Sequence, residues 1–205
     1  TYATFNNGGS AELNWNNTKR LETSSAGVTI TGTLAATALT GDGSGLTGVA
    51  GPNSDAQFNT KIGTNAGSSF NGVNPTHNTL YGNKAGESIN NGDRNTLIGS
   101  EAGKNATDSN NAVAVGYQAL YSMGGSRSYQ TAVGYQALYQ NAHGQECTAV
   151  GYQALYSNSS GDDQCAFGVY SLQNSNGANN TGFGYKSLQN VSNGANNSVL
   201  GSNAG

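Results

Sequence analysis

Three acidic residues, Asp162, Asp163 and Asp42, are the best candidates for acid–base chemistry in this 205-residue chain. A glycoside hydrolase needs two carboxylates roughly 5–10 Å apart on either side of a sugar. Successive side chains of an extended chain point in opposite directions, so Asp162 and Asp163 would diverge. Asp is also a common turn residue, and the sequence lacks the regular Gly-Asp repeat of calcium-binding β-rolls. We therefore interpret this acidic pair as part of a solvated turn.

Histidine and cysteine offer no catalytic or metal-binding pattern either. His77 and His143 have no Ser, Cys or Asp partner at a recognisable spacing, and we expect both in exposed loops. Cys147 and Cys165 are 18 residues apart, which fits neither a metal site nor a disulfide framework. They occupy neighbouring positions of the repeat described below, which face opposite ways in a strand, so we expect free thiols.

Residues 43–48 read Gly-Ser-Gly-Leu-Thr-Gly, which matches the dinucleotide-binding fingerprint. That fingerprint binds a phosphate only between a buried strand and a helix. Here it is followed by Val-Ala-Gly-Pro-Asn at residues 49–53, a stretch that cannot begin a helix of any length. We interpret it as a flexible joint, so the sequence predicts neither a cofactor nor an enzyme.

The composition points to an uncharged, turn-rich chain. Gly accounts for 31 residues, and charged residues make up 9% of the chain, where about 25% is usual. The eight Lys and Arg residues form no basic stripe, which argues against nucleic-acid binding. No apolar run approaches the length of a membrane span, so we expect no membrane insertion. Apolar residues at helical spacing are also missing, which argues against helices.

A repeat of about 17 residues determines the predicted architecture. Short apolar segments end in a glycine, and the successive glycines are separated by 19, 17, 17, 18, 17, 17, 16 and 17 residues. This period is too short for a pair of helices, and it suits one coil of a β-solenoid with two short strands and two turns. The anchor glycines are Gly63, Gly82, Gly99, Gly116, Gly134, Gly151, Gly168, Gly184 and Gly201.

Columns of equivalent residues predict how each coil is built. The residue before each glycine is mostly Ile, Val, Phe, Tyr or Leu, and we expect this column to face inward together with the mostly Thr column two residues earlier. The third residue after each glycine is always Ala or Ser, which indicates a tight interior corner. The glycine itself should adopt a backbone conformation that a Cβ would forbid.

The next position divides the coils into two subtypes. It is Gly in the first three coils and the last, and Leu in the middle five, where we expect the extra leucine to widen the core. One thin coil buries little apolar area, which favours intertwined or side-by-side chains over a monomer, although stacking alone could suffice.

The first fifty residues do not follow this rhythm. Residues 11–15 and 19–23 alternate in polarity on either side of Asn16 and Asn17, which predicts a hairpin. Residues 27–34 should form a third strand, and the glycine-rich residues 41–48 a connector. We expect a small β-rich region at 1–50 and a nine-coil solenoid at 51–205. Because the chain starts at Thr1 and stops at Gly205 inside a repeat, we expect it to be a fragment of a longer protein.

Two columns of tyrosine and one of glutamine run along the predicted stack. Stacked side chains of one kind stabilise neighbouring strands, and Gln118, Gln136 and Gln153 suit an amide ladder. We interpret the tyrosines as structural ladders, either at an interchain contact or, if exposed, stacked against glycans. The first ladder contains Tyr117, Tyr135, Tyr152 and Tyr185, and the second contains Tyr121, Tyr139 and Tyr156.

The chain resembles known fibrous appendages. The segment LETSSAGVTITGTL at 21–34, with GDGSGLTG at 41–48, resembles bacteriophage tail-fibre proteins, notably those of cyanophages and other marine phages. TAVGYQALY, at 131–139 and 148–156, is similar to phage fibre repeats, and its Ala-Val-Gly core is similar to the heads of trimeric autotransporter adhesins, whose repeats are usually shorter.

This resemblance implies a function in attachment. It implies an all-β, homotrimeric, non-catalytic segment of a virion tail fibre, in contact with other tail or fibre proteins and with a host receptor or polysaccharide. Two alternatives remain. One is a trimeric bacterial adhesin head, which a membrane anchor and coiled-coil stalk elsewhere in the gene would select. The other is a stand-alone binding solenoid, such as an ice-binding protein, which requires a flat, outward-facing Thr column.

Overall fold

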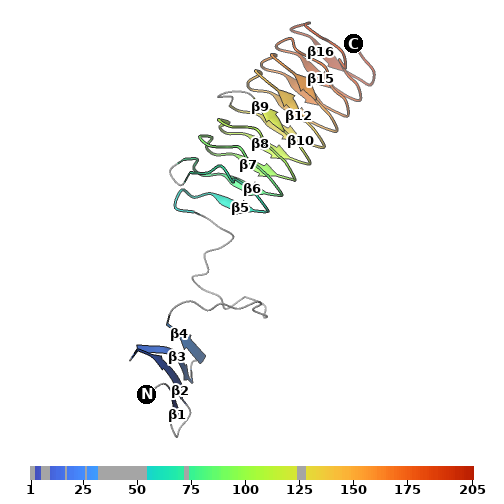
Figure 1. Cartoon of the computed structure of the whole chain (residues 1–205). Coiled ribbons are helices and arrows are strands. Elements are labelled where there is room, and N and C mark those ends of the chain that lie inside the picture. Colours follow the sequence, from blue (N-terminus) through green and yellow to red (C-terminus); the bar gives the residue numbers. More distant parts are fainter. Residues whose placement is uncertain are drawn as a thin grey trace. The chain divides into compact units, whose positions relative to one another are not determined.

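The computed structural model describes residues 3–5, 10–16, 18–25, 27–31, 55–71, 74–123 and 128–205. Every regular element among these residues is a β-strand (Figure 1). The chain divides into two compact units, Thr1–Gly48 and Val49–Gly205. The connector expected at 41–48, Asp42, and the boundary expected near Gly51 and Pro52 lie outside the described residues.

The first unit is a four-stranded antiparallel sheet in the order β1-β2-β3-β4. The predicted hairpin is confirmed: β2 (Ala11–Trp15) pairs with β3 (Thr18–Ser24), and Asn16 takes a left-handed φ of 52° in the turn. The predicted third strand is β4 (Gly27–Ile30), which ends before the residues that are not described. The sequence did not predict β1 (Ala3–Phe5), which pairs with β2.

The second unit is a regular stack of coils, a β-solenoid, as the repeat predicted. One strand from each coil joins a nine-stranded parallel sheet, and successive strands pair without any shift of register (Figure 1). Nine strands define eight complete turns about 17 residues apart. The strands are β5 (Thr60–Ile62), β6 (Thr79–Tyr81), β7 (Thr96–Ile98), β8 (Val113–Val115), β10 (Thr131–Val133), β12 (Thr148–Val150), β14 (Cys165–Phe167), β15 (Thr181–Phe183) and β16 (Ser198–Leu200).

The expected second strand of each coil forms in only part of the described stack. It is present as β9 (Ser122–Met123), β11 (Gln140–Asn141) and β13 (Ser157–Asn158), which make a three-stranded parallel sheet. In the other coils the equivalent residues are turns, bends or isolated bridges. The Asn-, Ser- and Gly-rich composition of these stretches favours turns over strands.

Backbone hydrogen bonds join the coils both within the sheet and around the corner that follows it. The N–H of Gly151 donates to the carbonyl of Val133 at 2.8 Å, and the N–H of Leu138 donates to that of Ala154 at 3.0 Å. Equivalent bonds recur along the stack at constant spacing. The corner is therefore as regular as the strand, and side chains at equivalent positions lie above one another.

Successive coils approach each other closely at the anchor glycines. All nine have a φ between 128° and 143°, a region that glycine alone adopts readily. A Cβ placed on Gly134 would overlap the carbonyl oxygen of Gly151 in the next coil. The expectation that these glycines adopt a backbone conformation that a Cβ would forbid is confirmed.

The predicted inward column is wrong. In the central coils the middle residue of each strand is the buried one, whereas its two neighbours are half-buried or exposed. Val133 and Thr131 therefore face outward on either side of the buried Ala132. In a strand of three residues the middle side chain points to one side of the sheet, and the first and third side chains point to the other. The narrow coil has room for only one of these side chains, so the middle residue faces inward. The predicted small corner column is confirmed, since Ala119, Ala137 and Ala154 are fully buried.

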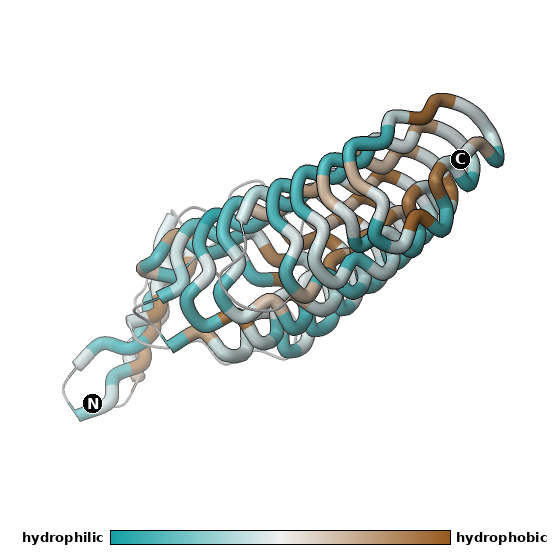
Figure 2. The backbone as a smooth tube through the Cα atoms, turned by 90° about the horizontal axis from the view of Figure 1, so that it is seen from above, coloured by the Kyte–Doolittle hydropathy of each residue, from teal (hydrophilic) through white to brown (hydrophobic). Residues whose placement is uncertain are grey.

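The core has a nearly constant volume because two inward positions compensate each other. Where the middle strand residue is large, as at Leu80 and Leu97, the position four residues after the anchor is Gly86 or Gly103. A Cβ on Gly103 would overlap the side chain of Leu97. Where the middle residue is Ala, the later position is a fully buried leucine: Leu120, Leu138, Leu155 and Leu172. The leucine thus fills space that a leucine on the strand fills elsewhere, and the expected widening of the core is not needed. Figure 2 shows hydrophobic segments recurring at the same place in successive coils.

A polar column lies inside the stack beside this apolar core. Asn59, Asn78 and Asn95 are almost fully buried, and each stands four residues before an anchor glycine. The Nδ2 of Asn95 donates to the Oδ1 of Asn78 at 2.9 Å, and the Nδ2 of Asn78 donates to that of Asn59 at 3.1 Å. Buried amides are tolerated when their hydrogen bonds are made. Amide stacking thus supplies part of the interior in a chain that is poor in apolar residues.

We expect the contact between anchor glycines to be more important than their backbone conformation alone. Gly134→Ala combines strain of about 1–3 kcal/mol for the unfavourable φ with overlap against Gly151. Gly201→Ala is the matched control, because the φ there is 143° but the added Cβ would meet only Ala204, at 3.5 Å. Urea unfolding should show Gly134→Ala to be less stable than the control by at least about 2 kcal/mol. Equal losses would refute the close-approach argument.

The compensation within the core predicts a non-additive pair of substitutions. Gly103→Leu should overpack the core and cost about 1–3 kcal/mol, and Leu97→Ala should leave a cavity at a cost of about 2–5 kcal/mol. The double variant recreates the arrangement of the middle coils. We expect it to lose less stability than either single variant, with a favourable coupling of at least about 2 kcal/mol in a double-mutant cycle. Additive losses would contradict shared core volume.

Candidate interaction surfaces

The two tyrosine ladders predicted from the sequence are present in the middle coils. In the first, the ring centroids of Tyr117 and Tyr135 are 5.5 Å apart, and those of Tyr135 and Tyr152 are 5.0 Å apart with an interplanar angle of 6°. In the second, the rings of Tyr121, Tyr139 and Tyr156 stack at 4.9 and 5.0 Å. The spacing follows the distance between neighbouring strands, about 4.8 Å.

Tyr185 does not continue the first ladder directly. Val169 takes the ladder position in the preceding coil, and Tyr170 stands one residue later. The ring of Tyr170 makes edge contacts with Tyr152 at 5.3 Å and with Tyr185 at 6.3 Å. The sequence analysis missed Tyr170, although its position beside the column was visible.

The stacking limits what the ladders offer to a ligand. Tyr117, Tyr135 and Tyr152 are 41–45% exposed, yet the faces of their rings lie against one another. A sugar that stacks on an aromatic ring needs a free face, so Tyr135, which lies between Tyr117 and Tyr152, presents its ring edge and hydroxyl group instead. In the second ladder, burial raises the pKa of Tyr139 above its ordinary value, and the neighbouring tyrosines add to that effect. The geometry therefore favours a structural function for both ladders.

The predicted glutamine ladder is confirmed, and it is longer than expected. The Nε2 of Gln136 donates to the Oε1 of Gln118, and that of Gln153 donates to Gln136, both at 2.8 Å. Gln173 then donates to Gln153 at 3.0 Å. Gln189 extends the ladder by donating to Gln173 at 2.8 Å. The sequence analysis missed these last two members because they belong to a different column from the first three.

Charged side chains end the amide ladder on its N-terminal side. The Nε2 of Gln118 donates to Glu101 at 2.7 Å, and Lys104 forms an ion pair with Glu101 at 3.1 Å. The hydrogen bond from Gln118, together with Lys104, holds the pKa of Glu101 below its usual range.

The first coil has a charged residue, Lys61, at the inward position of its strand. The ammonium of Lys61 lies 3.7 Å from the carboxylate of Asp55 and 4.8 Å from the ring centroid of Phe70.

Asp162, Asp163, His77 and His143, which were considered for catalysis, lie in bends or loops between strands. Asp162 accepts a hydrogen bond from the N–H of Gln145 at 2.8 Å, and Asp163 takes a left-handed φ of 54°, both as turn residues. His77 and His143 are exposed, as expected, and the ring of His77 stacks on Phe58 at 5.1 Å. No group of three His, Cys, Asp or Glu side chains among the described residues is placed to hold a metal ion.

Both cysteines are free thiols, as the sequence predicted. Cys147 belongs to the buried polar column, and its Sγ lies 3.3 Å from the carbonyl oxygen of Gly161. Burial raises the pKa of Cys147 to about 12, so this thiol is unreactive near neutral pH. Cys165 is partly exposed on the opposite side of the strand. Burial also raises its pKa.

The sheet presents a continuous uncharged surface that the sequence analysis assigned to the interior. We call it the outer face: the first and third residues of the nine strands in the large sheet. None of these side chains is buried. Six are Thr, one is Ser and the rest are hydrophobic: Ile62, Tyr81, Ile98, Val113, Val115, Val133, Val150, Cys165, Phe167, Phe183 and Leu200.

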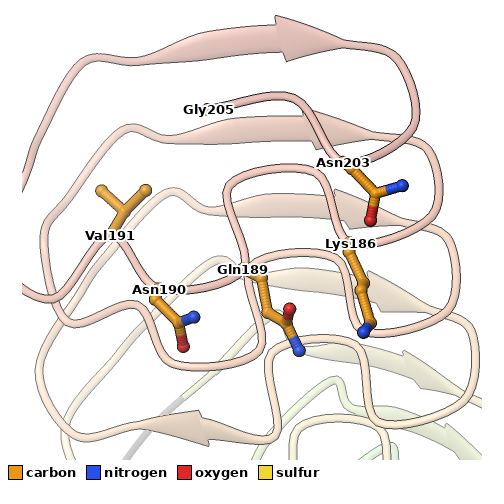
Figure 3. Close-up of a pocket in the computed structure, with 6 residues that line it drawn as sticks. All are labelled: Lys186, Gln189, Asn190, Val191, Asn203 and Gly205. Atoms are coloured by element: carbon orange, nitrogen blue, oxygen red, sulfur yellow. The ribbon is translucent and has the colours of Figure 1, made fainter.

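Two hollows lined mostly by polar residues lie on the described surface. One of about 240 Å³ lies over β9, β11 and β13. Another of about 200 Å³ lies at the last coil, where Lys186 and Asn203 stand on one side and Asn190 and Val191 on the other (Figure 3). Gln189 and Gly205 complete its lining, and the amide of Gln189 is already engaged with Gln173. Neither hollow brings together groups that would perform chemistry on a bound ligand.

Comparison with protein-family models, with curated proteins and with solved structures finds no match to this chain. Among the described residues, no helix is long and apolar enough to cross a membrane. The function must therefore be inferred from the repeat, the stacked fold and its surfaces.

We expect the amide ladder to resist the introduction of a carboxylate. Gln136→Glu keeps the acceptor for Gln153 but removes the donor to Gln118, at a cost of about 1–3 kcal/mol near pH 7. The folded state then disfavours the charged form, so the introduced carboxyl should have a raised pKa. The penalty should therefore shrink as the pH falls and vanish below the pKa of the unfolded chain.

Urea midpoints measured at several pH values test this expectation. The matched control is Asn193→Asp, which introduces the same charge at an exposed turn. If both variants show the same pH profile relative to the original chain, the ladder does not contribute to stability.

Proposed function

We propose that this chain is a structural, non-catalytic segment of a viral tail fibre that contributes to host attachment as a homotrimer. The observation that carries the proposal is the in-register stack of nine parallel strands, in which every coil is hydrogen-bonded to the next. Such a stack resists bending and local unfolding along its axis, because opening one coil exposes the backbone of its two neighbours. Its place would be the virion tail fibre, outside the host cell.

The sequence resemblance and the surface chemistry support the same proposal. The TAVGYQALY segments resemble phage fibre repeats, and they build the strand, the corner and both tyrosine ladders of the middle coils. The fibre would connect to other tail or fibre proteins and hold a receptor-binding region away from the particle. A host receptor or surface polysaccharide would be contacted through polar groups such as the exposed tyrosine hydroxyls, since the ring faces are covered.

Two other functions remain as alternatives. A trimeric bacterial adhesin head would use the same kind of stack, and a membrane anchor in the full-length gene would identify it. A stand-alone ice-binding solenoid gains one supporting observation, because the Thr column does face outward. However, the neighbouring column contains Tyr81, Phe167 and Phe183, which interrupt the flat surface that ice recognition requires.

The oligomeric state in solution distinguishes these proposals. Light scattering on the full chain should give three times the 20.8 kDa of one chain, and the trimer should persist in mild denaturant. A trimer supports the fibre and adhesin proposals. A folded monomer would refute the trimeric fibre, and inhibition of ice recrystallisation by that monomer would select the ice-binding alternative.

A further inference from the structure

We propose that the outer face is the surface through which parallel copies of this chain pack, each coil against the same coil of its neighbours. This inference rests on the proposed fibre function, because a fibre that runs from a particle to a distal tip has all its chains pointing the same way. It assigns the contact between copies to a surface that no feature of the sequence placed on the outside.

The chemistry of the outer face fits burial against another protein surface. Its third strand residue is aliphatic or phenylalanine in every coil except the second, which has Tyr81, and no residue of the face carries a charge. Ile98 and Phe183 are 39% and 48% exposed, although neither has a polar atom in its side chain. Exposed aliphatic and phenylalanine side chains gathered on one surface mark an interaction site.

The shape of the outer face favours three copies over two. Nine strands at about 4.8 Å make a face about 40 Å tall but only one short strand wide, which amounts to a few hundred Å². A stable interface usually buries about 800 Å² on each partner. One pair of narrow faces falls short of that area. Three copies around a common axis bury the face and its flanks against two neighbours at once.

The tyrosine ladders are a weaker candidate for this contact. The ladders cover only part of the stack, because the first three coils have Thr64, Asn83 and Ser100 where Tyr117 begins the first ladder. The outer face, by contrast, continues through all nine coils.

The residue sizes along the outer face also suit packing in register. Val115, Val133 and Val150 form a narrow middle section, whereas Phe167 and Phe183 stack at 4.7 Å into a bulky cluster. When parallel copies pack in register, the wide and narrow layers of each copy lie at the same height. A shift by a few coils would place the bulky cluster against the valine section.

The native cysteines provide the first test. Cys165 lies on the outer face and Cys147 is buried in the core. A short bis-maleimide, which joins two thiols by addition to its two double bonds, should link copies of the original chain and of Cys147→Ser. It should not link copies of Cys165→Ser. Absence of cross-linking in a sample that scatters light as a trimer would overturn the proposed face and leave the fibre proposal intact. A monomer would overturn both.

Introduced cysteines test direction and register. In a background with Cys147→Ser and Cys165→Ser, Thr96→Cys lies in the third coil and Thr131→Cys in the fifth. Parallel packing in register should cross-link both variants. Antiparallel packing would bring only the middle coils together, so cross-linking of Thr131→Cys alone would refute the parallel arrangement. Asn193→Cys, in an exposed turn, should give no product, and a product there would show that the reaction is unspecific.

A charge on the outer face should weaken assembly. Val133→Lys places an ammonium in the middle of the proposed interface, and we expect the trimer to dissociate at a protein concentration at least about tenfold higher than normal. The circular dichroism should be unchanged, because Val133 is not part of the buried core. Asn193→Lys is the matched control for the added charge. An unchanged dissociation of the Val133→Lys trimer would overturn the proposal.

Discussion

The backbone hydrogen bonding between successive coils is the constraint on which the rest of this structure depends. It fixes the distance between equivalent residues at the spacing of neighbouring strands, about 4.8 Å. Where two coils approach closely, at Gly134 and Gly151, no Cβ fits between them. The same spacing brings tyrosine above tyrosine and glutamine above glutamine, so the ladders are consequences of the backbone register and stabilise it in turn.

The interior is narrow, and its volume is shared between two positions of each coil. A leucine on the strand requires a glycine after the corner, as with Leu97 and Gly103. An alanine on the strand allows a leucine after it, as with Ala132 and Leu138. Satisfied amides such as Asn78 and Asn95 complete the interior. A chain with little apolar content thus folds because each layer needs few apolar atoms and reuses the same contacts.

The same narrow interior leaves apolar side chains on the outside of each coil. A three-residue strand that buries its middle residue must expose the other two, and here those two columns hold threonine and large hydrophobic residues. In an isolated chain this surface would be costly to leave in water. Assembly of copies through it would bury these side chains between chains. Structure and proposed function are connected at this point, since a rigid fibre requires both lengthwise stacking and lateral packing.

The sequence by itself determined the all-β class, the period of the coils, the anchor glycines, the small corner column and the ladders of stacked side chains. These features follow from local rules: turn chemistry, the conformational freedom of glycine and the recurrence of one residue type at one spacing. The compensation of Leu97 by Gly103, and of Ala132 by Leu138, was not predicted, because the sequence analysis placed the middle residue of each strand on the outside.

Only the tertiary structure decided which side of each strand faces inward. The alternation of a three-residue strand is compatible with either facing, and both candidate columns contain apolar residues. Which side faces inward depends on how much space the corner and the opposite wall of the coil leave for side chains, and the sequence of a single coil does not show this space. For the same reason the structure alone showed that β9, β11 and β13 are the second strands present among the described residues. A second strand persists only where neighbouring coils align their turns closely enough to pair.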